Sequence, residues 1–525
     1  LPADMERAFA VSLHSYQVSA HGNTRTYTFH APLSRPTIPS ELATSVSVVA
    51  GLDTRPSLRP LYHSASQQIR RAPPAAMPAA TGNPLGSLTV ADFANDYDVQ
   101  PLYKRGVTGK GRTLAIATLA SFTPSDAFAY WSALKLKVNK NRLKIVNVDG
   151  GPGSPSDASG SFETTIDVEQ SGGIAPGANI IVYQAPNTNQ GFVDLFAAAV
   201  DSNAADTISV SWGFWEWYQN LENSPVTDPI TGKSVGLLNA FHELFVRAAI
   251  QGQTLFAASG DGGAYDANND FGCSPESTPS CSTPLTVDNP ASDTAMTAAG
   301  GTTLPGLQEY CLNSACTPPY YDINLTHERV WGWDYLNGYC SAIGVPDPIA
   351  CGTFPGGSGG GVSIIFAKPV YQYSLPGVQR SQPGQRWIYD GTLTYVLPSN
   401  YAGRNVPDIS FNADPQTGYV VYYTSDVSGF SVQPYWGGTS FVAPQLNGVS
   451  ALLGDYLHGS PLGLLNYPLY GLALSGDAYG GPNPPLHPIA YGDNWFYQGT
   501  NGYNPGAGLG TLDVANFARV LGNLF

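Results

Sequence analysis

Charged residues are scarce in this chain. They make up 12% of its 525 residues, about half of the usual share. If every carboxyl group were protonated, only the 24 lysines and arginines and the 8 histidines would carry charge. Because few positive charges limit the self-repulsion that unfolds proteins in acid, this composition favours a protein that works at low pH.

Other absences exclude several kinds of partner. No apolar run reaches the ~18 residues that a membrane-spanning helix needs, so we expect no contact with a membrane. The net charge of −15 and the lack of a basic stripe argue against a nucleic-acid partner. The first residues, LPADMERAFA, do not form a basic segment followed by an apolar one, so we expect that any signal peptide has been removed or is not included in this sequence.

Cysteine is absent outside the stretch from 273 to 351. The six cysteines form no C-x-x-C pair, and no histidine lies at zinc-finger spacing. With one glycosylation sequon at Asn324, the even number of cysteines favours a secreted, extracellular protein. The sequence does not fix the pairing, and six reduced, buried thiols are the alternative. Their short separations suggest the local disulfides Cys273–Cys281, Cys311–Cys316 and Cys340–Cys351.

Three regions follow one another along the chain. Residues 1–69 have the pattern of a small α+β unit, in which a helix-like DMERAFAVSLHSY leads into two alternating stretches around a His-Gly-Asn turn. Residues 70–87 are rich in Ala, Pro and Gly, which predicts an exposed linker and processing region. Residues 88–525 form the third and largest region.

Apolar β-branched runs alternate with helical patterns in that third region. Helical spacing occurs at 191–200 and 237–250. The alternation predicts an α/β fold with a doubly wound parallel sheet and helices on both faces. The segment 262–355 is loop-rich and holds every cysteine, so we interpret it as an insertion. The runs that predict buried strands are 113–118, 143–148, 179–184, 207–212 and 254–259.

Two carboxyl groups lie four residues apart in SFETTIDVEQ, at Glu163 and Asp167. On a helix they would occupy the same face. Two carboxyl groups in one confined site share a single proton, so Glu163 could accept a hydroxyl proton while Asp167 orients it. The alternative is solvated helix surface, the common fate of such a pair. Glu169 is expected to be an exposed charge.

A serine and a third acid have the context of a reaction site. Ser440, in GGTSFVAP, is predicted at a helix N-terminus whose N–H groups can receive an oxyanion; an N-cap serine is the alternative. Asp261, in SGDGG, follows a buried strand and could donate to that oxyanion if it is protonated. The alternative is a turn-forming Asp-Gly. No histidine lies in a segment that suits a catalytic base.

Taken in order, the segments from about 88 onward resemble the sedolisins, the serine-carboxyl peptidases with a subtilisin-like fold. By that resemblance Glu163 is the general base, Asp167 its partner, Ser440 the nucleophile and Asp261 the oxyanion acid. The cleft residues are then Trp212, Gly260, Gly438 and Thr439; for Trp212 a core aromatic is the alternative. The motifs are GVTGKGRTLAIA, E-x-x-x-D, GIAPGANI, SVSWG, AASGDGGA, GGGVSIIFAKPVYQ, RNVPDISFNADPQTGY and GGTSFVAP.

The resemblance also implies a prodomain. Residues 1–69 are similar to the later part of a sedolisin prodomain, which would assist folding and cover the cleft until acid weakens its contacts. Two departures stand out. Thr118 lies where many relatives carry a glutamate, and Pro488 and Asn504 lie where the family's calcium site has carboxylates. Because calcium prefers anionic oxygen ligands, we expect no calcium there and no other cofactor.

These observations predict a secreted, acid-active endopeptidase that acts on proteins or peptides as a monomer. A tripeptidyl-peptidase of the same family is one alternative. An Asp-His-Ser subtilisin is another, although its nearest histidine candidate, His21, precedes the catalytic region. A secreted binding protein that has kept the fold without turnover is the third.

Overall fold

The computed structural model describes most of the chain. The described residues are 2–18, 27–34, 36–42, 45–46, 48–55, 58–64, 69–72, 83–216, 226–227, 234–271, 283–389 and 393–523. Within these ranges no helix combines the length and apolar character needed to span a bilayer.

An eight-stranded sheet forms the centre of the molecule. Its strand order is β17-β14-β12-β8-β5-β7-β6, with β22 also paired to β14, and every pair except β14–β17 is parallel. The predicted α/β architecture is therefore confirmed. The strands are β5 (Thr113–Thr118), β6 (Leu143–Asn147), β7 (Asn179–Gln184), β8 (Thr207–Val210), β12 (Thr254–Ala258), β14 (Thr297–Thr303), β17 (Arg329–Val330) and β22 (Ile409–Asn412).

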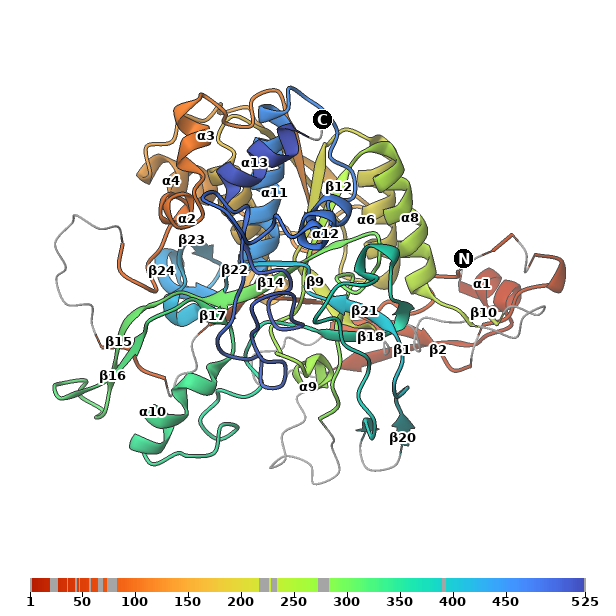
Figure 1. The fold of residues 1–525 in the computed structure, drawn as a ribbon. Helices are drawn as coiled ribbons and strands as arrows, with labels where there is room; N and C mark the ends of the chain where they lie inside the picture. Colours follow the sequence, from red (N-terminus) through yellow and green to blue (C-terminus); the bar gives the residue numbers. More distant parts are fainter. Residues whose placement is uncertain are drawn as a thin grey trace.

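Helices cover both faces of this sheet, because successive side chains of a buried strand point to opposite sides. In β5, Leu114 and Ile116 belong to one core, whereas Ala115 and Ala117 belong to the other. Figure 1 shows the two helix layers on either side of the strands. The first layer contains α2 (Val90–Asp96), α3 (Gln100–Lys104), α4 (Pro124–Ala133), α5 (Ser161–Ile174), α11 (Thr439–Tyr456) and α13 (Val514–Gly522); the second contains α6 (Asn189–Ser202) and α8 (Leu237–Gln251).

Two strand predictions and the predicted insertion need correction. The run at 143–148 is not buried, because β6 is the edge strand and pairs only with β7. The run at 207–212 divides at Ser211, and β9 (Trp212–Trp215) leaves the main sheet to pair with other segments. The segment 262–355 is not wholly an insertion, since β14 and β17 belong to the central sheet.

The N-terminal unit has the predicted order of elements. Helix α1 (Pro2–Phe9) precedes an antiparallel hairpin of β1 (Leu13–Val18) and β2 (Tyr27–Pro32). The helix is shorter than its sequence pattern, because residues 13–16 pair with β2 instead. The His-Gly-Asn turn and His21 lie outside the described residues.

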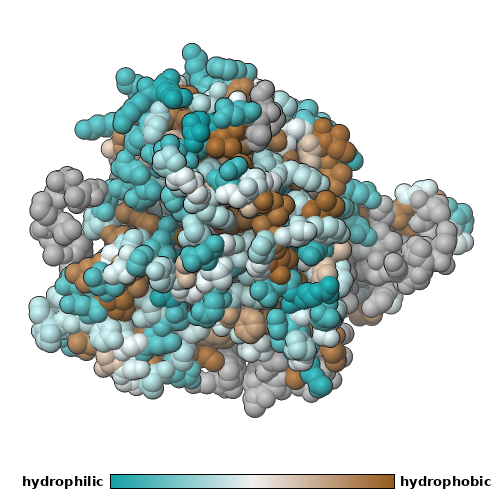
Figure 2. All heavy atoms as spheres, viewed as in Figure 1, coloured by the Kyte–Doolittle hydropathy of each residue, from teal (hydrophilic) through white to brown (hydrophobic). Residues whose placement is uncertain are grey.

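Two of the three suggested disulfides are present, Cys311–Cys316 and Cys340–Cys351. The third pair, Cys273 and Cys281, lies outside the described residues. On the face seen in Figure 2, hydrophobic residues are interspersed among hydrophilic ones, as is usual for a solvent-exposed surface.

The remaining elements are short and lie around this core. They are β3 (Arg59–Pro60), β4 (His63–Ser64), β10 (Val226–Thr227), β11 (Ser234–Val235), α9 (Asp266–Phe271), β13 (Asp288–Asn289), β15 (Gly306–Cys311), β16 (Tyr320–Leu325), α10 (Asn337–Ala342), β18 (Gly361–Ala367), β19 (Arg386–Tyr389), β20 (Leu393–Val396), β21 (Gly403–Val406), β23 (Tyr419–Ser425), β24 (Gly429–Gly437), α12 (Asn466–Ser475), β25 (Leu486–His487) and β26 (Thr511–Leu512).

Candidate active site

Two buried helices carry the predicted acid pair and the predicted serine. All 14 residues of α5 are buried, and α5 packs against α11. Glu163 lies in the first turn of α5 and Asp167 one turn later, both without solvent exposure. The segment is helical, the condition under which the two carboxyl groups share one face, and they do not lie on a solvated surface.

Ser440 lies in the first turn of α11, where its Oγ donates to Glu163 Oε2 at 2.9 Å. Its side chain makes no capping hydrogen bond, since the N-cap position belongs to Gly438. Gly438 has a φ of +106°, and a Cβ there would lie 2.4 Å from Asp261 Oδ2. Only glycine fits this close approach. The helix start therefore presents the serine to the acid.

The acid pair is arranged to hold protons. Ser211 Oγ donates to Asp167 Oδ1 at 2.7 Å. Glu163 Oε1 and Asp167 Oδ2 are buried and have no hydrogen-bond partner among the described residues. Burial, followed by the charge of Asp167, raises the pKa of Glu163, and burial likewise raises the pKa of Asp167. A buried pair of this kind retains a proton at a pH where exposed carboxyl groups would be ionised.

Asp261 lies just beyond β12. Its Oδ1 accepts hydrogen bonds from the Thr439 N–H at 2.8 Å and the Thr439 Oγ1 at 2.9 Å. Its Oδ2 is buried with no partner among the described residues. Burial raises the pKa of Asp261 to about 7. The group is therefore protonated in acid and has one oxygen available as a donor.

Glu163, Asp167 and Asp261 form what we call the acid cluster. Residues 58–64 of the N-terminal unit, the crossing segment, lie across it and across Ser440. Leu61 donates its N–H to the Ser211 carbonyl at 3.0 Å, and its own carbonyl accepts from the Ser440 N–H at 3.0 Å. On one side of Leu61, β3 pairs antiparallel with β9, and on the other side β4 pairs antiparallel with β24. The Leu61–Tyr62 peptide bond thus lies against Ser440 as the bond of a substrate would.

The carbonyl of Leu61 and the carboxyl of Asp261 face the same point. An added Cβ on Gly438 would meet Asp261 Oδ2 at 2.4 Å and the Leu61 oxygen at 2.7 Å. An oxyanion formed on Leu61 would have the Ser440 N–H beside it and the free oxygen of Asp261 nearby. Sequence reasoning missed this segment, because LRPLYHS contains no motif that distinguishes it from other loops.

The expected cleft residues have different surroundings. The Trp212 backbone pairs with Pro60 of the crossing segment, and its Nε1–H donates to Thr118 Oγ1 at 3.0 Å. Gly260 donates its N–H to Thr439 Oγ1 at 3.1 Å, and Thr439 in turn holds Asp261. The Thr118 hydroxyl therefore helps to fix the Trp212 ring.

Glu169 corrects a prediction. It is fully buried rather than exposed, and its Oε1 accepts from the Tyr422 N–H of β23 at 3.2 Å. Burial raises its pKa well above the ordinary value. Its partner lies far away in the sequence, so the local pattern contained no sign of this contact.

In the C-terminal loop, Asn504 forms hydrogen bonds with the backbone at both ends of its side-chain amide. Asn504 Nδ2 donates to the Ile489 carbonyl at 3.3 Å, and its Oδ1 accepts from the N–H groups of Gly506 and Ala507. The amide of Asn504 thus stabilises the backbone of this loop, and it supplies no carboxylate oxygen. Among the described residues, no three His, Cys, Asp or Glu side chains form a group that could hold a metal.

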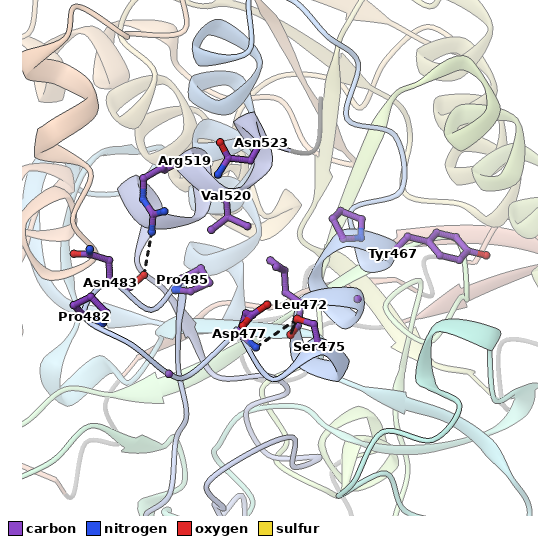
Figure 3. A pocket seen from close by; sticks show the side chains of 13 residues that line it. Tyr467, Leu472, Ser475, Asp477, Pro482, Asn483, Pro485, Arg519, Val520 and Asn523 are labelled. Atoms are coloured by element: carbon purple, nitrogen blue, oxygen red, sulfur yellow. Dashed lines mark hydrogen bonds between the residues drawn. The ribbon is translucent and has the colours of Figure 1, made fainter.

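A cavity of about 760 Å³ lies elsewhere, between α12 and α13 (Figure 3). Tyr467 and Leu472 line it from α12, and Arg519 lines it from α13 while donating to the Asn483 carbonyl at 3.2 Å. None of the predicted site residues contributes to its lining. This cavity is separate from the acid cluster.

Known proteins are similar to this chain over nearly all of its length, which corresponds to about three quarters of their own. Kumamolisin from Bacillus sp. (strain MN-32) is 29% identical over 524 residues, covering 97% of this chain and 76% of its own. Sedolisin from Pseudomonas sp. (strain 101) is 27% identical over 533 residues, and the match covers 98% of this chain and 73% of the relative. Comparison with models of protein families gave no match.

A solved structure supports the same assignment. Pseudomonas sedolisin, a serine-carboxyl proteinase complexed with pseudo-iodotyrostatin, is 26% identical with a TM-score of 0.60, and the match covers 84% of this chain and 99% of that one. The similarity to these relatives supports a serine peptidase. Together the comparisons support membership of the sedolisin family.

Proposed function

We propose that this protein is a secreted, acid-active serine-carboxyl endopeptidase that cleaves proteins or peptides through an acyl-enzyme on Ser440. The observation that carries the proposal is the 2.9 Å hydrogen bond from Ser440 Oγ to Glu163 Oε2. A serine hydroxyl becomes an effective nucleophile when a neighbouring base accepts its proton. In this site the base is a carboxylate.

In the acylation step, Ser440 Oγ attacks the substrate carbonyl and Glu163 accepts the hydroxyl proton. The Ser440 N–H and the protonated Asp261 donate to the oxyanion that forms. Glu163 then gives its proton to the leaving amine. Asp167, held by Ser211, shares the remaining proton of the acid pair and keeps Glu163 oriented. Deacylation repeats these transfers with water in place of the amine.

The crossing segment favours an endopeptidase over a tripeptidyl-peptidase. A tripeptidyl-peptidase must receive a free N-terminus three residues before the cleaved bond, which here would be at Arg59. The chain instead continues to Leu58, which is buried and whose carbonyl accepts from Asn187 Nδ2 at 2.7 Å. A cleft that holds chain beyond this position can bind an internal peptide bond.

We also infer that residues 1–69 are part of an inhibitory prodomain. Residues 58–64 occupy the cleft, so an external substrate cannot reach Ser440 while they remain there. Cleavage would begin at Leu61–Tyr62, before the predicted processing region at 70–87, of which residues 73–82 lie outside the described part. Two disulfides support secretion, because such bonds persist in oxidising compartments.

The full-length chain tests this proposal. After transfer from neutral pH to about pH 4, mass analysis should detect cleavage between Leu61 and Tyr62, followed by hydrolysis of a peptide library. Ser440→Ala should remain intact under the same conditions, since loss of the nucleophile removes nearly all turnover. A Ser440→Ala rate above ~1% of the wild-type rate would contradict the mechanism.

A further inference from the structure

The crossing segment places an arginine at a defined distance from the bond beside Ser440. If Leu61 is counted as the first residue before that bond, Arg59 is the third. Its backbone pairs with Gly213 of β9, and its Nη2 lies 3.2 Å from Asp266 Oδ1. The arginine side chain therefore meets a carboxylate while its backbone is held in the position of a substrate.

Asp266 is a buried residue that lies close to the acid cluster. It is the first residue of α9, its side chain is 1% exposed, and it lies beside Gly260, where an added Cβ would be 3.1 Å from its Oδ1. Its Oδ2 is buried with no partner among the described residues. A buried carboxylate is costly unless a cation or donors compensate it. An arginine of the bound chain supplies that compensation.

We propose that Asp266 is a specificity-determining residue that binds a basic side chain, arginine in preference to lysine, at the third position before the cleaved bond. This inference rests on the peptidase activity proposed above. The planar guanidinium can donate to both carboxylate oxygens, whereas an ammonium acts as a single point charge. Arg59 of the prodomain would then occupy the subsite that binds the third residue of a substrate before the cleaved bond.

Paired peptides test the subsite after removal of the prodomain. The two peptides share Leu-Tyr at the cleaved bond and differ only in having Arg or Gln at the third position before it. Burial raises the pKa of Asp266 to about 6, so kcat/KM is compared at the highest pH that still gives turnover. Wild type should favour the Arg peptide by about tenfold, and Asp266→Asn should reduce the ratio to near one.

The ratio of kcat/KM for the Arg and Gln peptides cancels any effect of the substitution on the catalytic step itself. The charge of Asp266 raises the pKa of Asp261, so Asp266→Asn can change the rate on both peptides equally. A change in the ratio reports only contacts with the third residue. Asp266→Lys should favour a peptide with Glu at that position. Equal kcat/KM values for Arg and Gln peptides in wild type would overturn the inference while leaving the proposed peptidase intact.

A second measurement needs no turnover. In full-length Ser440→Ala, amide hydrogen exchange at Leu61 reports how often the segment leaves the cleft. Arg59→Gln and Asp266→Asn should each increase this exchange about tenfold, and the double variant should add little more. Arg55→Gln is the matched control, because Arg55 pairs with Asp53. Unchanged exchange in Arg59→Gln would overturn the inference even if the enzyme cleaved no peptide.

Discussion

The acid cluster and the C-terminal loop use buried polar side chains in opposite ways. In the cluster, Glu163, Asp167 and Asp261 each keep one buried oxygen without a partner among the described residues. In the loop, Asn504 uses both ends of its amide in hydrogen bonds to the backbone. Buried oxygens without a hydrogen-bond partner thus occur where we expect protons to move. In the loop, where the amide has only a structural role, its nitrogen and its oxygen both form hydrogen bonds.

The two regions should also respond differently to acid. A carboxyl group changes its charge with pH, whereas an amide does not titrate in this range. The cluster should therefore control activity through protonation, while the loop should hold its geometry over the same pH range. Substitutions in the cluster should therefore change the kinetics, whereas substitutions in the loop should change the stability.

The largest effect should come from the base. Glu163→Gln keeps the size of the side chain but cannot accept the Ser440 proton, so kcat should fall by about 10²- to 10⁴-fold. Glu169→Gln is the matched control, since Glu169 is equally buried on the same helix and its side chain, within the part of the chain that the structure describes, bonds the Tyr422 N–H. Similar kinetic losses in both variants would mean that buried acids on α5 act only through stability.

Asp261 should set the alkaline limit of activity. Its pKa is raised to about 7 by burial, so it donates to the oxyanion below that pH and loses this proton as the pH rises through it. Wild-type kcat should fall across this interval. Asp261→Asn should lower kcat by about 10- to 100-fold in acid and abolish the fall near pH 7, because an amide donates at every pH. A variant that kept the same limit would exclude Asp261 as its source.

The loop should lose stability when its amide is removed. Asn504→Ala leaves the N–H groups of Gly506 and Ala507 without their acceptor, which should lower the free energy of unfolding by about 1–3 kcal/mol. Thermal unfolding of the full chain measures this change. The exposed Asn501 in the same loop provides the control, and Asn501→Ala should have little effect. Equal losses would indicate that Asn504 has no special role.

The smallest effect should come from calcium removal. We expect no calcium site in this loop, because Asn504 offers an amide instead of a carboxylate and donates to the Ile489 carbonyl. A strong chelator should therefore leave the melting temperature of wild type unchanged. The double variant Pro488→Asp, Asn504→Asp restores two carboxylates and should melt at a higher temperature with calcium than without it. A chelator-induced drop in wild type would contradict this part of the account.

Local patterns were sufficient for the elements that carry the site. The apolar runs of β5, β7 and β12 and the helical spacing of α6 and α8 matched the structure closely, because their surroundings impose one periodicity along the whole element. The helical form of α5 was only a condition of the argument about Glu163 and Asp167, and the structure meets it. The meeting of Glu163 with Ser440 was implied by the order of several motifs, since no single motif places two residues so far apart in contact.

The features that the sequence did not predict correctly all depend on contacts between distant parts of the chain. The run at 143–148 is as apolar as a central strand, but the number of neighbouring strands depends on topology rather than on its own residues. Glu169 is stabilised by a backbone N–H of β23, which follows it by more than 250 residues. Residues 58–64 gain their conformation from pairing with β9 and β24. Long-range contacts of this kind leave no local pattern.

Rapid-quench mass analysis of the processed enzyme with a peptide ester at about pH 4 tests the central claim most directly. The account predicts a covalent acyl group on Ser440 that forms about 10²- to 10⁴-fold more slowly in Glu163→Gln than in wild type. Acylation of another residue, or equal acylation rates in the two proteins, would contradict it.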